Sequence, residues 1–136
     1  MKKYLIGFGL ALIASTAIAD SFWNHNGSIM RLSDYGNERV FSYEHPSDKM
    51  QSAGVRSGDV LFNGVRRGDK YYGTAHVFSK YCNHSLPYKV SGNVYKDAKV
   101  VLSGTRPSYD TGYNKGCLPN GKMRTDTLVF TYISSE

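Results

Sequence analysis

The chain has few of the residues and spacings that mark common metal, redox and catalytic sites. It has only two cysteines and no Cys-x-x-Cys pair, which argues against a thioredoxin-like redox motif. Its four histidines are scattered, without the short spacings of metal ligands, so we expect no metal site and no cofactor. No Gly-x-Ser-x-Gly motif is present, and no carboxylate pair stands out from ordinary solvated charges. These absences predict a protein that is not an enzyme.

Long hydrophobic runs are missing except at the beginning of the chain. Two lysines precede an almost wholly apolar run over residues 4–13, and the small residues that follow end in Ala-Ile-Ala at position 19. This is the pattern of a signal peptide, and the run is shorter than the roughly 20 residues of a membrane span. We therefore expect residues 1–19 to be removed and residues 20–136 to form a single β domain. The protein is then periplasmic or secreted, without a membrane span.

Charge of either sign is not dense. The net charge of +6 falls to +4 once the two lysines of the leader are removed, and no long lysine run remains. This mildly basic balance does not indicate a nucleic-acid partner. It leaves open an attraction to an acidic partner, such as an anionic glycan or lipid headgroup.

The two cysteines, Cys82 and Cys117, are predicted to form one disulfide, because an even pair in an exported chain usually does so. The chain-entropy estimate for a loop of about 36 residues is roughly 4 kcal/mol of stabilisation. The alternative is a redox or metal-binding thiol pair, which the spacing does not support.

Turn residues recur about every ten positions, and Val, Thr and Tyr are plentiful between them, which predicts an antiparallel all-β domain. About seven to eight short strands must hide their edges, so we expect a small β-barrel or sandwich. Residues 47–53 are expected to form one helical turn, with Ser47 as N-cap and Gly54 at its exit. The expected strands cover residues 28–33, 39–44, 60–65, 70–79, 88–94, 99–103 and 127–133.

Two further features of the strand pattern bear on packing and function. In the strand 70–79, one face carries small residues such as Gly73 and Ala75, so we expect another element to approach it closely. The stretch 105–125 lacks periodicity and is rich in glycine and proline, so we expect a long loop tied down by Cys117. A tethered long loop favours a functional role.

The tyrosines carry the strongest functional signal, because the chain has eleven of them against one tryptophan. Tyrosine combines apolar area with a polar tip and suits contact surfaces, although it also fills small β cores. We expect a non-enzymatic binding module that contacts a protein or glycan of the envelope or host. Its aromatic side chains would stack on sugar rings or a partner protein, and its cations would pair with acidic groups. Basic residues at a hairpin tip also serve to keep strand edges soluble. The predicted ligand-binding residues are Arg66, Arg67, Arg106, Tyr109, Tyr113 and Lys115.

A catalytic alternative depends on one short turn. His25 lies three residues before Ser28, so an Asn-Gly turn between them would bring an imidazole near a hydroxyl. The same residues also suit a plain turn between strands, which we favour.

The start Trp23-Asn24-His25-Asn26-Gly27-Ser28-x-Met30-x-Leu32 resembles a set of small exported alphaproteobacterial proteins of unknown function. The similarity continues in Gly73-Thr74-Ala75-x-x-Phe78 and Tyr88-x-Val90-x-Gly92 and covers most of the domain, both cysteines included. It implies export and a single domain, and it implies no activity.

In size, compartment, cysteine pair and strand number the chain also resembles the bacterial inhibitors of c-type lysozyme. The nearest match to their inhibitory loop is Ser91-Gly92-Asn93-Val94-Tyr95-Lys96, whose surroundings depart from the family pattern. The resemblance implies inhibition of a host hydrolase as the alternative function, and it is a likeness of architecture. A third possibility, a barrel that carries an apolar ligand, requires a cavity inside the barrel.

Overall fold

The computed structural model describes residues 19–110 and 117–136. In this part of the chain, eight antiparallel strands close into one barrel, in which each strand pairs with its neighbours in sequence and β8 pairs with β1. The predicted all-β barrel is therefore confirmed. No described helix is long and apolar enough to cross a membrane. The elements are β1 Ala19–His25, β2 Ser28–Tyr35, β3 Glu38–His45, α2 Asp48–Ser52, β4 Val60–Arg67, β5 Lys70–Val77, β6 Leu86–Tyr95, β7 Lys99–Tyr109 and β8 Pro119–Ser135.

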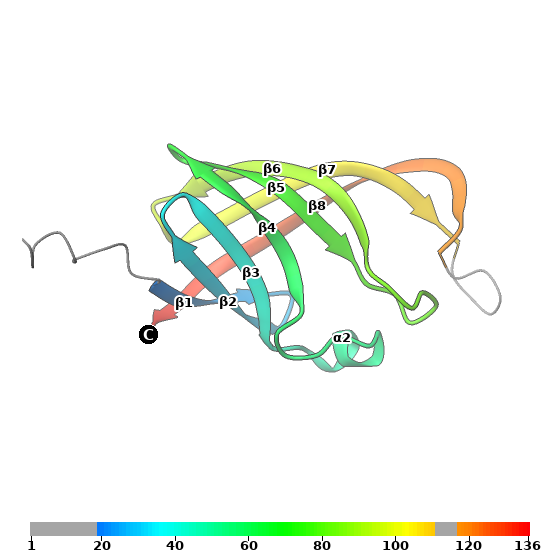
Figure 1. Ribbon diagram of the computed structural model, residues 1–136, viewed down its shortest axis with the longest axis horizontal. Coiled ribbons are helices and arrows are strands. Elements are labelled where there is room, and N and C mark those ends of the chain that lie inside the picture. The colour runs from blue at the N-terminus through cyan, green and yellow to red at the C-terminus, as the bar shows by residue number, and fades with distance from the viewer. Residues whose placement is uncertain (1–18, 111–116) are drawn as a thin grey trace, which may run out of the picture.

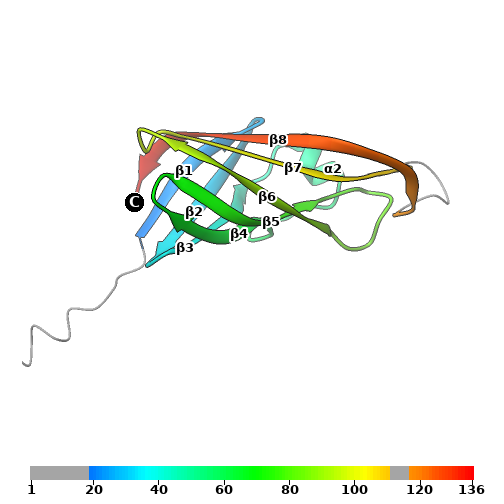
Figure 2. The same ribbon diagram turned by 90° about the horizontal axis from the view of Figure 1, so that it is seen from above.

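The connections between strands gather at two ends of the barrel, because successive strands run in opposite directions (Figure 1). One end, which we name the termini end, holds the turns after β2, β4 and β6, the start of β1 and the end of β8. The other, the helix end, holds the β1–β2 turn, α2, the β5–β6 loop and the β7–β8 connection. Figure 2 shows β7 and β8 running together beyond the other strands at the helix end.

Side chains fill the interior of the barrel. Along β2 and β3 every second residue is buried over much of the strand, as the alternation of a one-sided sheet requires. The rings of Phe41 and Phe130 stack with their centroids 3.9 Å apart, and Phe62 lies 6.5 Å from Phe41. All three rings are completely buried. The middle of the barrel is thus a packed core, as is usual for eight strands with large inward side chains.

The single described helix, α2, begins as predicted. Ser47 is its N-cap, and the Ser47 hydroxyl accepts a hydrogen bond from the backbone N–H of Met50 at 3.3 Å. Gly54 follows the helix with a φ of +92°, a value that glycine adopts without strain. These two residues fix where the chain between β3 and β4 turns across the helix end.

The small-residue face of β5 is explained by close contact with a neighbouring strand. Gly73 pairs with Gly64 of β4, and a Cβ atom built on Gly73 would lie 2.2 Å from the backbone oxygen of Asn63. The element that approaches this face is therefore the adjacent strand and not a second layer.

Two sequence-based expectations differ from the structure. The prediction of a long loop over residues 105–125 was wrong for most of that stretch, because β7 continues to Tyr109 and β8 begins at Pro119. This part of β8 is exposed on both faces, so it carries no apolar alternation. Strand β1, which begins at Ala19 and pairs with β2, was not predicted at all.

Candidate functional site

A pocket of about 190 Å³ opens into the barrel at the helix end, and we name it the mouth pocket. The up-and-down topology places the last residues of β1, β3 and β5 at this end, beside the first residues of β6. Four polar or aromatic side chains from these positions line the pocket: His25, Tyr43, His76 and Tyr88. Mouths of β-barrels are among the usual positions for ligand sites.

His25 is held by two contacts and is only 6% exposed. Its Nδ1 atom lies 2.9 Å from the backbone oxygen of Val129, which accepts the hydrogen bond, and its ring stacks on Phe130 at 4.6 Å. Burial lowers the pKa of His25 from its usual 6.5, and the hydrogen bond to Val129 offsets part of this effect. The ring is therefore neutral near pH 7.

His76 lies on the opposite side of the mouth and is half-buried. Its Nδ1 atom lies 3.3 Å from the hydroxyl oxygen of Ser85, and burial lowers its pKa. Both histidines thus offer neutral rings, each of which has one donor and one acceptor.

The two tyrosines keep their hydroxyl protons. Burial, assisted by the charge of Asp59, raises the pKa of Tyr43 to about 12. Burial raises the pKa of Tyr88 as well, together with the charge of Asp126. The edge of the Phe78 ring packs against Tyr43 with centroids 5.9 Å apart. These four side chains are therefore aromatic or uncharged, while Lys49 and Asp126 bring charge to the same lining, a combination that can bind a polar ligand.

An ion pair from β7 and β8 forms one wall of the mouth. The Arg106 Nε donates to Asp126 at 2.6 Å, and the guanidinium lies 5.8 Å and 5.7 Å from the ring centroids of Tyr88 and Tyr109. Arg124 donates to the other oxygen of Asp126 at 2.8 Å. Arg106 is only 8% exposed, so its charge serves to position this wall.

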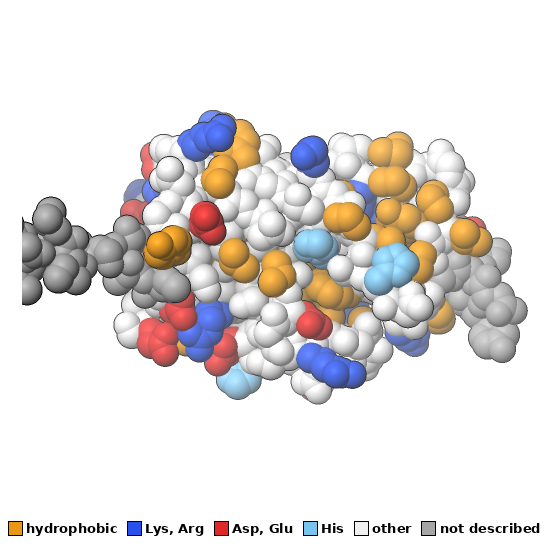
Figure 3. All heavy atoms as spheres, viewed as in Figure 1, with side chains coloured by type: hydrophobic (Ala, Val, Ile, Leu, Met, Phe, Trp, Pro, Cys, Tyr) orange, Lys and Arg blue, Asp and Glu red, His pale blue; other side chains and the backbone are white. Residues whose placement is uncertain are grey.

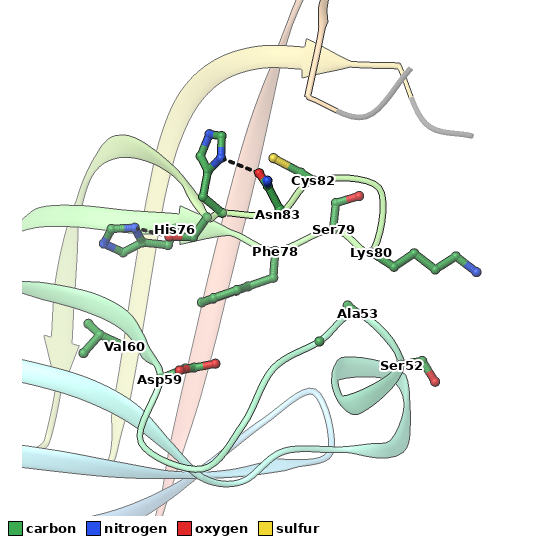
Figure 4. Close-up of a pocket in the computed structure, with 13 residues that line it drawn as sticks. Ser52, Ala53, Asp59, Val60, His76, Phe78, Ser79, Lys80, Cys82 and Asn83 are labelled. Atoms are coloured by element: carbon green, nitrogen blue, oxygen red, sulfur yellow. Dashed lines mark hydrogen bonds between the residues drawn. The ribbon is translucent and has the colours of Figure 1, made fainter. Parts of the chain in front are cut away.

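A wider groove of about 670 Å³, here named the loop groove, adjoins the mouth pocket (Figure 4). The residues that follow α2 form one side, and the β5–β6 loop forms the other. His76 and Phe78 line both hollows, and Figure 4 shows the Phe78 ring between His76 and Asp59. An aromatic ring here stands among polar side chains, which include Asp59, Ser79, Asn83, His84 and Ser85.

The predicted disulfide between Cys82 and Cys117 is confirmed. It joins the β5–β6 loop to the residues just before β8, with a Cα–Cα distance of 5.2 Å. The bond therefore links the wall of the loop groove to the β7–β8 connection. Figure 3 shows hydrophobic side chains and histidines gathered at this end of the molecule.

The structure separates the predicted binding residues into two groups. Arg66 and Arg67 lie at the termini end, where Arg66 pairs with Asp97 at 2.9 Å and Arg67 lies 6.0 Å from the Tyr72 ring. Arg106 and Tyr109 lie together at the helix end. The two remaining predicted residues, Tyr113 and Lys115, are outside the described residues.

The sequence-based selection did not include the residues that line the two hollows. The predicted ligand-binding residues included none of His76, Phe78, Tyr43 and Tyr88. The sequence did contain a sign of this site. Aromatic and histidine residues lie near the ends of the expected strands, and an up-and-down barrel brings those strand ends together.

Among the described residues, no hydrogen bond joins the His25 imidazole to the Ser28 hydroxyl, the contact that the catalytic alternative requires. The Ser28 hydroxyl oxygen accepts the backbone N–H of Ser47 at 2.9 Å, while His25 donates to Val129. Each residue thus has a structural partner of its own.

Comparison of the chain with protein-family models, with curated proteins and with solved structures gives no match.

Proposed function

We propose that this protein is an exported, non-enzymatic binding module that holds a glycan at the helix end of its barrel. The observation that carries the proposal is the Phe78 ring, which stands between the mouth pocket and the loop groove among polar side chains. Sugars present apolar C–H faces and many hydroxyl groups. An aromatic ring surrounded by groups that donate and accept hydrogen bonds is complementary to both.

The packed interior supports a surface role over transport of an apolar ligand. Below the mouth pocket of about 190 Å³, the completely buried rings of Phe41, Phe62 and Phe130 fill the described part of the barrel interior. A drug-sized apolar ligand needs a pocket of roughly 300 Å³ or more. A ligand therefore sits across the two hollows and not inside the barrel.

Export is part of the proposal and has two supports. The sequence begins with the pattern of a signal peptide, and the confirmed disulfide suits an oxidising compartment. We place the working protein in the periplasm or outside the cell.

Inhibition of a host hydrolase would require a protruding loop. The nearest match to such a loop, residues 91–96, lies mostly in β6, where Ser91 and Gly92 pair with both neighbouring strands. The glycan proposal is therefore the one that the geometry of the helix end favours.

Binding of the purified protein to an array of bacterial-envelope and animal glycans tests the proposal. We expect binding to at least one glycan class, and we expect Phe78→Ala to weaken it about tenfold or more, as loss of a central contact does. Tyr72→Ala is the control, since Tyr72 is an exposed aromatic of β5, the strand that Phe78 follows, and lies outside both hollows. A pull-down from envelope extract gives the contrary outcome. If no glycan binds and the purified chain retains a protein from the extract, the glycan proposal is wrong and the partner is a protein.

A further inference from the structure

Three metal-ligating side chains meet beside the loop groove. The two sulfur atoms of Cys82 and Cys117 and a ring nitrogen of His84 all lie within 4.8 Å of one another. They come from two separate connections, the β5–β6 loop and the segment that precedes β8. While the disulfide is intact, neither sulfur is a thiolate, so these atoms cannot act as a metal site.

We propose that reduction of the disulfide converts this cluster into a binding site for one Zn²⁺ ion, with Cys82, Cys117 and His84 as ligands. A dithiol reductant supplies two electrons and two protons, and it leaves as its own cyclic disulfide. The two cysteine thiols then lose their protons to solvent as the ion binds. This inference concerns a state of the protein in which the disulfide is open, and it does not rest on the proposed glycan binding.

The geometry suits a tetrahedral zinc ion. Zn–S bonds of about 2.3 Å place two thiolates about 3.8 Å apart, so the sulfurs need to separate only modestly after reduction. Both cysteines lie outside the strands, and the Cα–Cα distance of 5.2 Å can adjust without breaking strand pairs. Two thiolates and one imidazole match the ligand preference of zinc.

The environment of His84 supports a ligand role. The His84 Nδ1 lies 3.0 Å from the side-chain oxygen of Asn83, which accepts a hydrogen bond from the Nδ1–H, an arrangement that leaves the ring lone pair on Nε2 (Figure 4). Metal-bound histidines commonly donate their other N–H to an oxygen in this way. Cys82 and His84 both line the loop groove, so the fourth coordination position opens toward it and can hold water.

The test uses Co²⁺ as a spectroscopic substitute for Zn²⁺. The full chain is reduced with dithiothreitol, desalted without oxygen and titrated with Co²⁺, while circular dichroism records whether the barrel remains folded. We expect thiolate-to-cobalt charge-transfer absorption that saturates at one ion per chain, and displacement of Co²⁺ by Zn²⁺. The oxidised protein should show none of these signals.

The His84→Ala variant separates this site from a simple pair of thiols. We expect it to weaken Co²⁺ binding about tenfold or more and to alter the visible spectrum, whereas His45→Ala, at an exposed histidine, leaves both unchanged. A second readout is alkylation of the cysteines, which Zn²⁺ should slow in the parent chain more than in His84→Ala. The proposal is overturned if the parent chain and His84→Ala bind Co²⁺ equally and if Zn²⁺ protects their cysteines from alkylation equally. This holds whether the reduced chain is folded or unfolded.

Discussion

Buried arginines stabilise both ends of the barrel. At the termini end, Arg39 donates to the carboxylate of Asp34 at 2.9 Å and to the backbone oxygens of Gly36 and Glu38. At the helix end, Arg106 bonds to Asp126 and lies between two tyrosine rings. A buried charge is tolerated only when it is paired and hydrogen-bonded in this way. These residues therefore close the ends of the packed core.

The same pairing explains why binding cations were hard to select from the sequence. A sequence shows which residues are charged but not which of them are neutralised inside the fold. Arg106 and Arg66 both form ion pairs within the chain, while Arg67 forms none with any described residue. The partner of Arg106, Asp126, is 20 positions away, so residue type and turn position could not reveal that pair. Arg66 pairs both with the nearby Asp69 and with Asp97, which is 31 positions away.

Acid should destabilise the fold through His25. Its pKa is below 6.5 in the folded protein, so the unfolded chain binds a proton first as the pH falls. The stability that the neutral His25 contributes is fully present above about pH 6.5, the usual pKa of histidine. It is lost as the pH falls from there toward the lower pKa of His25 in the folded protein. His25→Asn, which can still donate to Val129, should lower stability at pH 7 but give a weaker dependence on pH. Urea unfolding at pH 7.5 and at about pH 5.5 measures both effects.

His45→Asn provides the control for this prediction, because His45 is exposed. We expect it to keep the pH dependence of the parent protein. His76, whose pKa burial also lowers, leaves some dependence in the His25 variant. An identical decrease in stability between the two pH values for parent and His25→Asn would contradict the assignment.

At the scale of elements, the strands with one buried face were the ones that the sequence predicted well. Alternation located β2, β3 and β4 to within about two residues, and the Ser47 cap located α2. The outer parts of β7 and β8 were not predicted as strands. Residues 104–109 pair only with β8, and their one buried side chain is that of Arg106, so no apolar alternation marks them. Pro107 fits there, since a strand edge without a partner does not need its missing N–H.

Close strand contact at Gly92 should make this position intolerant of any side chain. A Cβ atom there would lie 1.7 Å from the backbone oxygen of Val101 on β7, and backbone cannot move aside as a flexible side chain can. We expect Gly92→Ala to destabilise the barrel by about 3 kcal/mol, the upper part of the usual range for overpacking. Thermal and urea unfolding of the two proteins measure the difference.

Gly36→Ala is the matched comparison. Nothing lies within 4 Å of a Cβ at Gly36, and its φ of +59° adds only backbone strain of about 1 kcal/mol. Equal losses in the two variants would show that β6 and β7 do not approach as closely as the structure indicates.

At the scale of the whole molecule, the closed barrel divides the surface into two unlike ends. The termini end carries ion pairs of Arg39 with Asp34 and of Arg66 with Asp69 and Asp97. Along the barrel wall, Arg31 of β2 pairs with Asp20 of β1, with Glu44 of β3 and with Glu136. The helix end has the mouth pocket, the loop groove, the neutral histidines and the disulfide. Fold class and disulfide could be predicted from the sequence, but the site could not, because it exists only once eight strand ends are brought together.

The disulfide should stabilise the molecule as a unit. It encloses β6 and β7 in a loop with a sequence separation of 35 residues, so it restricts the unfolded chain across two strands that the barrel requires. We expect the double variant Cys82→Ser, Cys117→Ser to lose about 4 kcal/mol in free energy of unfolding. The urea midpoint should fall with little change in slope, since the barrel still unfolds in one step.

Parent protein reduced in a metal-free buffer is the control, and its midpoint should match that of the double variant. A smaller loss together with a shallower slope would mean that the helix end already opens separately from the barrel. In that case the disulfide would act locally, on the loop groove and on the segment before β8. Because the groove wall carries Cys82, such local opening would also weaken ligand binding in the double variant more than it lowers global stability.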